Sequence, residues 1–211
     1  METDKKYKLT DECITFSNRK LYRIEALKDF SDVEKGEKGG FVENERNLSQ
    51  ENNCWIYDDA KVFDNASVFG NAIVGENACI KDNASVFGNA IVSGNAKIYG
   101  YAKIYGNALI YENAVVCENA EVYEFAIVDG NAMISGDATV VSNSDYIVFK
   151  NWWSSGRYFT WTRSNNMWSV GCFYGTGEEL ITKAYKDSEL SGREYERVVK
   201  YVETILKDSE Q

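Results

Sequence analysis

The side chains best suited to bind a charged ligand lie in the last third of the chain. Arg157 and Arg163 can each form paired hydrogen bonds to a carboxylate or a phosphate. A segment of about 65 residues needs large apolar side chains for its core, so some of the neighbouring tryptophans must be buried. We therefore expect the two arginines, rather than the tryptophans, to contact an anion or a partner. The tryptophans are Trp152, Trp153, Trp161 and Trp168.

The residue types that usually perform catalysis are poorly represented. The chain contains no histidine, the commonest general base near neutral pH and the commonest metal ligand. Glu118 and Glu124 are the remaining candidates for a base. The composition favours a non-catalytic protein without a metal or cofactor, with an enzyme as the alternative. Five cysteines form no Cys-x-x-Cys pair, so we expect free thiols at Cys13, Cys54, Cys79, Cys117 and Cys172.

The charge balance is acidic, with 33 acidic and 23 basic residues and a net charge of −10. A surface of this sign repels phosphate, which excludes long nucleic acids as partners. The first 30 residues lack the apolar segment of a signal peptide, and no stretch is suited to cross a bilayer. Together with free thiols, this favours a cytoplasmic location and no membrane partner.

A six-residue repeat fills the middle of the chain. Its fold must therefore determine where most of the surface side chains lie. Alanine recurs at every sixth position from Ala60 to Ala138, and a valine or isoleucine follows two residues later. Ile56 extends the frame to fifteen aliphatic positions. A period of six fits neither a helix nor a long strand. Each unit is predicted to be one short strand and a corner, with the aliphatic residue and the alanine pointing inward.

The predicted corners carry Gly, Asp or Glu followed by asparagine, which precedes ten of the fourteen alanines. We expect asparagine to adopt the left-handed backbone that a tight corner needs and to bond its neighbours in the stack. Tyr101 and Phe125 replace asparagine at two corners. An aromatic residue there would be strained, so both are candidates for contact with another subunit or a partner.

This pattern resembles the left-handed parallel β-helix of hexapeptide-repeat proteins, in which three units complete one triangular coil. The resemblance implies a mainly β fold of about five coils and a homotrimer formed through the sides of the prism. The best-known members are acyltransferases that use acetyl-coenzyme A, a histidine base and loops extruded from the coils. This chain has no histidine and no insertion in its repeats, so no catalytic residue is carried over.

Both ends of the chain are predicted to be separate modules. Residues 1–47 form an N-terminal β cap with a hairpin, 48–143 the solenoid, and 144–211 an α+β module of three strands and two helices. Capping-box spacings predict helix starts at Thr176 and Ser191. Residues 25–33 and 54–58 resemble uncharacterised transferase-like repeat proteins of bacteria and phages, and residues 162–176 resemble a module of phage proteins. The resemblance implies a phage or prophage origin.

Sorting the outward positions by coil gives three faces, and one of them is apolar. Exposure of such a stripe to water is unfavourable, so we predict a trimer interface, with burial under the terminal modules as the alternative. A second face is aromatic and either stabilises the strands by stacking or forms a docking platform for a partner. A third, mixed face of interleaved lysines and aromatic residues is expected to be solvated, with binding of a small phosphorylated ligand as the alternative. The apolar stripe is Trp55, Ile73, Ile91, Leu109 and Ile127, and the aromatic residues are Phe69, Phe87, Tyr105 and Tyr123.

These features favour a non-catalytic homotrimeric binding protein of phage or prophage origin. Its partner would be a host protein or a small anionic ligand, and its role would include inhibition of host defence in the host cytoplasm. The alternative is a coenzyme-A-dependent acyltransferase that uses a base other than histidine.

Overall fold

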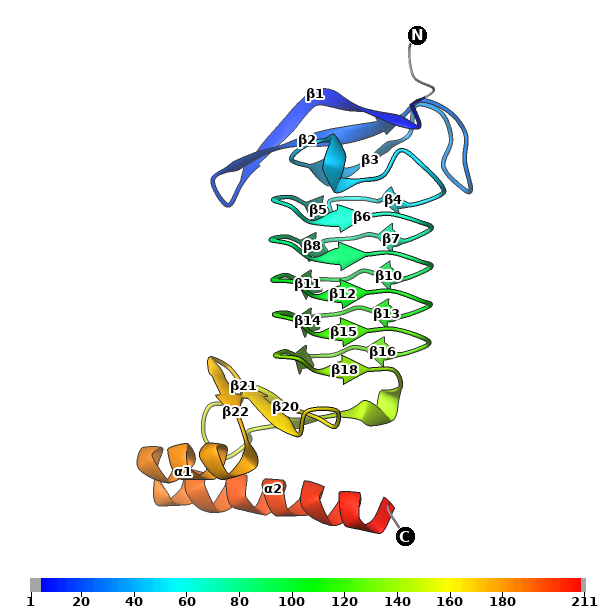
Figure 1. Cartoon of the computed structure of the whole chain (residues 1–211). Coiled ribbons are helices and arrows are strands. Elements are labelled where there is room, and N and C mark those ends of the chain that lie inside the picture. The colour runs from blue at the N-terminus through cyan, green and yellow to red at the C-terminus, as the bar shows by residue number, and fades with distance from the viewer. Residues whose placement is uncertain (1–4, 210–211) are drawn as a thin grey trace.

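The hexapeptide repeats fold into a parallel β-solenoid with a module at each end. The structure is a computed structural model and describes residues 5–209. In Figure 1 the coils form a tall stack between a β-hairpin at the N-terminal end and a module of sheet and helices at the C-terminal end. The protein is thus mainly β, with a small helical module after the solenoid.

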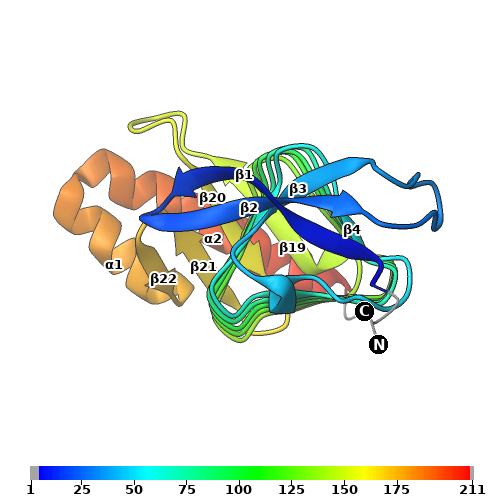
Figure 2. The ribbon, with the colours of Figure 1, turned by 90° about the horizontal axis from the view of Figure 1, so that it is seen from above.

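Each repeat contributes a two-residue strand, and the strands stack into three sheets whose coils superimpose when seen from above (Figure 2). The apolar face consists of β4 (Trp55–Ile56), β7 (Ile73–Val74), β10 (Ile91–Val92), β13 (Leu109–Ile110) and β16 (Ile127–Val128). The aromatic face consists of β6 (Ser67–Val68), β9 (Ser85–Val86), β12 (Lys103–Ile104), β15 (Glu121–Val122) and β18 (Thr139–Val140). The mixed face consists of β3 (Lys38–Val42), β5 (Lys61–Val62), β8 (Cys79–Ile80), β11 (Lys97–Ile98), β14 (Val115–Val116) and β17 (Met133–Ile134).

The solenoid core is a column of aliphatic residues and alanines. Strands of successive coils pair in register, as β10 does with β13 through Ile91 and Leu109. The repeated alanines from Ala60 to Ala138 are fully buried, and the aliphatic residue two positions after each is buried as well. The predicted inward pair is therefore confirmed.

The solenoid has about six turns, whereas the fifteen repeats predicted five. β3 lacks the repeat motif but pairs in parallel with β5, and Leu48, after the short helix η1 (Glu45–Asn47), bridges Val68. These segments supply an additional first turn. Gly39 and Gly40 permit the close approach, because a Cβ at either position would lie 2.5 Å from an atom of Ile56.

The backbone of the corners differs from the prediction. The left-handed residue is the one before the asparagine, with φ of +57° at Asp64, +70° at Gly88 and +58° at Glu112. Gly100 and Glu124 take this role before Tyr101 and Phe125. The strain predicted for these two aromatic residues was therefore wrong, because each lies one position after the left-handed residue.

The asparagines of the corners form hydrogen-bonded ladders, as predicted. Asn71 Nδ2 donates to Asn89 Oδ1 over 3.1 Å, and Asn89 Nδ2 donates to Asn107 Oδ1 over 3.2 Å. The repeat therefore selects asparagine for its side chain, which links successive coils, and not for its backbone.

An antiparallel hairpin of β1 (Tyr7–Phe16) and β2 (Arg19–Ala26) covers the N-terminal end and pairs with β3. This end corrects the prediction for Trp55 as an interface residue. Trp55 is fully buried in its own chain, with its ring edge-on to Tyr7 at 6.1 Å and to Phe30 at 5.4 Å between centroids. For this residue the alternative, burial under a terminal segment, is correct.

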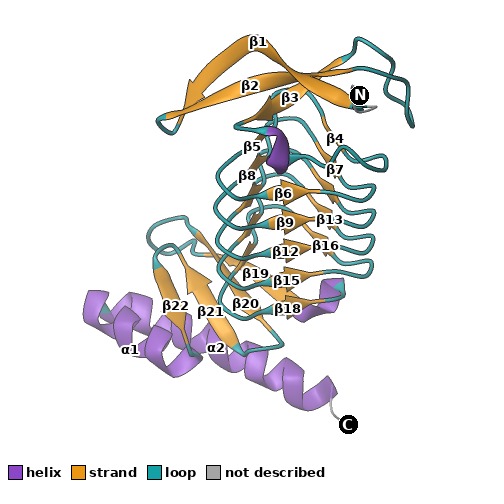
Figure 3. Ribbon diagram, turned by 45° about the horizontal axis from the view of Figure 1, so that its top comes forward, coloured by secondary structure: helices purple, strands orange, loops and turns teal. Residues whose placement is uncertain are grey.

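The C-terminal module consists of an antiparallel sheet covered on one side by two helices, as Figure 3 shows. Its elements are β19 (Tyr146–Lys150), β20 (Tyr158–Thr162), β21 (Met167–Val170), β22 (Phe173–Gly175), α1 (Gly177–Asp187) and α2 (Glu189–Ser209). Trp161 and Trp168 are buried between sheet and helices, whereas Trp152 is 76% exposed. No helix within residues 5–209 is long and apolar enough to cross a membrane.

Two details of this module differ from the predictions. The sheet has four strands and not three, because Gly171, with φ of +59°, turns the chain between β21 and β22. The capping box at Thr176 is confirmed, since Thr176 and Glu179 bond each other's backbone amides. The second predicted start was wrong. α2 begins at Glu189, and Ser191 lies inside it with its amide donating to Ser188 Oγ over 3.1 Å.

The module also covers the last coil of the solenoid. On each face, a side chain accepts a hydrogen bond from an amide of the last strand, and these contacts satisfy donors that would otherwise lie open at the edges. The Ile127 amide donates to Asn143 Oδ1 of the short helix η2 (Asn143–Asp145) over 3.0 Å. The amide of Met133 donates to Thr160 Oγ1 over 2.9 Å, and that of Thr139 to Ser164 Oγ over 2.7 Å.

Candidate functional site

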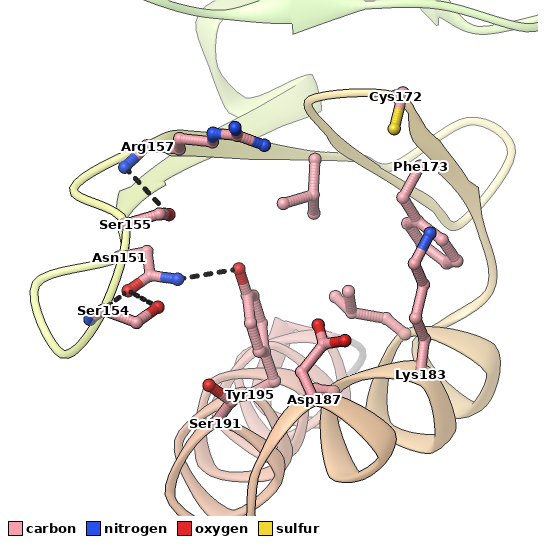
Figure 4. Close-up of a pocket in the computed structure, with 13 residues that line it drawn as sticks. Asn151, Ser154, Ser155, Arg157, Cys172, Phe173, Lys183, Asp187, Ser191 and Tyr195 are labelled. Atoms are coloured by element: carbon pink, nitrogen blue, oxygen red, sulfur yellow. Dashed lines mark hydrogen bonds between the residues drawn. The ribbon is translucent and has the colours of Figure 1, made fainter.

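A polar cavity of about 200 Å³ lies in the C-terminal module between the loop before β20, the β21–β22 turn and the two helices. Figure 4 shows the side chains around it. The polar lining includes Asn151, Arg157, Lys183, Asp187 and Tyr195, and apolar residues such as Val170 and Leu180 complete the wall. The cavity is smaller than the pockets that hold drug-sized ligands, so it suits a small molecule.

Arg157 lies in the loop between β19 and β20, and hydrogen bonds across this loop hold it in place. The Asn151 amide donates to the Arg157 carbonyl over 2.8 Å, and Asn151 Oδ1 accepts from the amide and the hydroxyl of Ser154. These bonds fix the chain at Arg157, immediately before β20 begins. Its guanidinium has no acidic partner among the described residues and extends over the cavity (Figure 4).

Tyr195 brings a buried hydroxyl to the cavity. Its side chain comes from α2 and is only 7% exposed, and its hydroxyl accepts a hydrogen bond from Asn151 Nδ2 over 3.0 Å. Burial raises the pKa of Tyr195, so the hydroxyl keeps its proton at neutral pH. Within residues 5–209 no acceptor for this proton is found, and Figure 4 shows the hydroxyl directed into the cavity. It is therefore available as a donor to a ligand.

α1 supplies one positive and one negative side chain. Lys183 Nζ lies over the ring of Phe173, 5.3 Å from its centroid. Asp187 points toward the cavity from the helix side, across from Arg157 (Figure 4). The cavity thus has the Arg157 guanidinium on the sheet side and a lysine, a tyrosine hydroxyl and the Asp187 carboxylate on the helix side.

The other predicted contact residues lie away from this cavity. Arg163 is exposed at the end of β20 and does not line the cavity. Tyr101 and Phe125 are 64% and 74% exposed on different corners of the solenoid. Arg157 alone among the predicted contact residues belongs to the cavity, and the roles of the others remain predictions.

The aromatic face forms a continuous stack. Phe69, Phe87, Tyr105 and Tyr123 lie ring on ring, with centroids 4.7 to 4.9 Å apart and nearly parallel planes. The stacking predicted from the sequence is confirmed. A role of this face as a docking platform remains a prediction.

The apolar stripe is partly open to solvent. Ile91 is 38% exposed, while Ile73, Leu109 and Ile127 are half-buried and lie in register along the face. This arrangement is compatible with a subunit interface, which stays a prediction for these four residues.

The two candidate bases lie at corners of the solenoid. Glu118 Oε2 accepts a hydrogen bond from the Gly136 amide over 2.6 Å, so its carboxylate links two coils. Glu124 is exposed and adopts a left-handed backbone with φ of +55°. Neither residue lines the cavity. Within residues 5–209 no cluster of three or more possible metal ligands is present.

The sequence interpretation missed Asn151, Lys183, Asp187 and Tyr195 as site residues. A weak signal was available in the spacing, because Lys183 and Asp187 lie three and seven residues after the buried Leu180 and next to the buried side of α1. Both side chains are exposed, so the sequence alone could not distinguish them from ordinary surface charges.

Two comparisons relate the solenoid to known proteins. Residues 102–118 match the family model described as YdcK Beta solenoid repeat. The chain is also similar to the Uncharacterized acetyltransferase YdcK of Escherichia coli (strain K12), with 44% identity over 62 residues. That alignment covers 26% of this chain and 19% of the relative's length. The matches support a β-solenoid built from short repeats.

Proposed function

We propose that this protein is a non-catalytic binding protein whose C-terminal module holds a small anionic molecule in the polar cavity. The observation that carries the proposal is the guanidinium of Arg157, which lines the cavity without an acidic partner among the described residues. A guanidinium binds a carboxylate or a phosphate through two parallel hydrogen bonds. The Tyr195 hydroxyl supplies a further donor.

The charge of the whole chain supports a small ligand over a long one. With a net charge of −10, the surface repels a polyanion along its length. A small anion meets mainly the local charges of the cavity, where Arg157 and Lys183 outnumber the one carboxylate, Asp187. The proposed ligand is therefore a small carboxylate or phosphate compound.

Arg157→Gln tests this function. Titration calorimetry with 4-methylpentanoate and with inorganic phosphate should show saturable binding of at least one of them to the full chain. We expect the substitution to weaken that binding by about tenfold or more, because it removes a charge-assisted pair of hydrogen bonds. The matched control is Arg163→Gln, which changes the charge equally outside the cavity. Equal losses of affinity in both variants would contradict the proposal, and so would the failure of every carboxylate and phosphate compound tested to bind the unmodified protein.

We also propose that three copies associate through the apolar face, as the partly exposed stripe around Ile91 suggests. The left-handed winding of the coils is proposed from the repeat pattern alone. On the resemblance of both chain ends to phage proteins, we propose that the protein acts in the cytoplasm of a host cell and sequesters its ligand against host defence. The free cysteines of the structure are compatible with a reducing compartment.

Acetyl transfer from acetyl-coenzyme A is a second candidate function. The similarity to an uncharacterized acetyltransferase favours it. Because the chain has no histidine, the base would be a carboxylate, Glu118 or Glu124.

Calorimetry with acetyl-coenzyme A, followed by turnover assays against a panel of amines, distinguishes the two functions. Saturable binding with turnover that is lost in Glu118→Gln or Glu124→Gln, but kept in Glu112→Gln, would support the enzyme and overturn the non-catalytic proposal. Absence of both binding and turnover would remove the second candidate.

A further inference from the structure

We propose that the ligand of the cavity is a zwitterion, a free α-amino acid with an apolar side chain. This inference rests on the proposed function, because it names the chemical class of the ligand for the same cavity. It goes further in assigning a second charge to the ligand, which must be positive.

The first observation is the placement of opposite charges on opposite walls. The Arg157 guanidinium lies on the sheet side and the Asp187 carboxylate on the helix side (Figure 4). Among the described residues neither group forms an ion pair. An anion bound to Arg157 would face the charge of Asp187, whereas a ligand that also carries an ammonium group would satisfy both walls.

The second observation concerns Lys183, which lies one helical turn before Asp187. The two residues are four positions apart on α1, a spacing that permits an ion pair on a helix. Lys183 instead places its Nζ over the ring of Phe173, and Figure 4 shows it extending away from Asp187. The carboxylate of Asp187 is therefore left for a positive group of the ligand.

The third observation is the form of the remaining lining. The Tyr195 hydroxyl is directed into the cavity with an unused proton and can donate to a carboxylate oxygen. Val170, Leu180 and Ala184 provide apolar wall against which an aliphatic side chain can pack. A volume of about 200 Å³ limits the ligand to the size of a single small metabolite.

The test compares leucine with two analogues, each lacking one of its charges. Titration calorimetry on the full chain uses leucine, 4-methylpentanoate, which lacks the ammonium group, and 3-methylbutylamine, which lacks the carboxylate. We expect leucine to bind about tenfold or more tightly than either analogue, because only leucine engages both walls.

Asp187→Asn identifies the group that recognises the ammonium. In this variant leucine should bind no more tightly than 4-methylpentanoate, while the affinity for 4-methylpentanoate should be unchanged or higher. Glu178→Gln, at the start of α1 and outside the cavity, is the matched control and should leave all three affinities unchanged. The comparison of ligands on the unmodified protein holds even if the variant folds poorly.

The outcomes separate this inference from the function on which it rests. If leucine and 4-methylpentanoate bind equally to the unmodified protein, the zwitterion is wrong and the anion-binding function stands. If Asp187→Asn keeps the preference for leucine, the assignment of the ammonium to Asp187 is wrong. If neither leucine nor any anion binds, both are wrong.

Discussion

At the scale of single residues, the corners of the solenoid divide two tasks between neighbouring positions. The first position takes the left-handed backbone and carries Gly, Asp or Glu, and the second carries the asparagine whose side chain bonds the next coil. Glutamate is an uncommon residue for a left-handed backbone, yet Glu76, Glu112, Glu118 and Glu124 all adopt it. The close stacking of the coils must therefore compensate for some local strain.

The distance from a corner glycine to its neighbouring atoms decides which residue can replace it. Gly94 and Gly130 have φ of +68° and +62°, so an alanine at either site costs about 1 kcal/mol of backbone strain. A Cβ at Gly94 would lie 2.5 Å from the Glu112 nitrogen, whereas the nearest atom at Gly130 is 3.9 Å away. We expect Gly94→Ala to lower the free energy of unfolding by about 1–3 kcal/mol more than Gly130→Ala, measured by urea denaturation. Equal losses would show that backbone strain alone decides the corner residue.

At the residue scale, the sequence predicted identities better than conformations. Asparagine was recognised as the corner residue and its bonding along the stack was predicted correctly, but the left-handed backbone was assigned to it and not to the residue before it. Two neighbouring positions of a fixed repeat have the same period, so periodicity cannot tell which of them carries the turn. The distinction requires the backbone angles.

At the scale of elements, the aromatic face shows how side chains support very short strands. Each strand has only two residues, so contacts between coils have to stabilise the register. Phe87 lies between Phe69 and Tyr105, with ring centroids 4.8 and 4.9 Å away, whereas Phe69 stacks on Phe87 alone.

Phe87→Ala should therefore cost more stability than Phe69→Ala. Each stacked pair contributes about 0.5–1.5 kcal/mol beyond buried area, and the inner substitution removes two pairs while the outer one removes a single pair. The difference is measured as a shift in the midpoint of urea unfolding for the two variants. If the two shifts are the same, the stack is a geometric result of the repeat and contributes little stability.

Elements were predicted well where a period or a cap spacing marks them and poorly elsewhere. The repeat frame located the strands of the solenoid, and the capping box located α1. β3 was missed because its pairing depends on two glycines that admit Ile56, and not on a motif. The cavity could not be predicted because it joins a loop, a turn and two helices, whose arrangement depends on tertiary packing.

At the scale of the whole molecule, the three faces of the solenoid differ in what they expose. The apolar face keeps Ile91 open near its middle, while its first residue, Trp55, is covered by the N-terminal segment. Sorting the sequence by face could not detect this cover, because Tyr7 and Phe30 lie outside the repeat. The proposed subunit interface is thus shorter than the sequence stripe.

Ile91→Asp should dissociate the proposed trimer. A carboxylate buried between subunits would lose its hydration without gaining a partner, so we expect a decrease in mass from three chains to one in light scattering. Lys97→Asp is the matched control, since Lys97 occupies the same position of its repeat on the mixed face. An unchanged mass for Ile91→Asp would show that this face is not an interface.

The contacts that close the last coil have a consequence for the behaviour of the protein in solution. Every coil is a template for the next one, because all of them share one register, and an open last coil would accept the strands of a second molecule as its own continuation. Asn143, Thr160 and Ser164 each occupy one amide, one on each face, at which such growth would begin. These small polar residues are thereby placed to keep the protein a discrete particle and prevent the growth of a fibre.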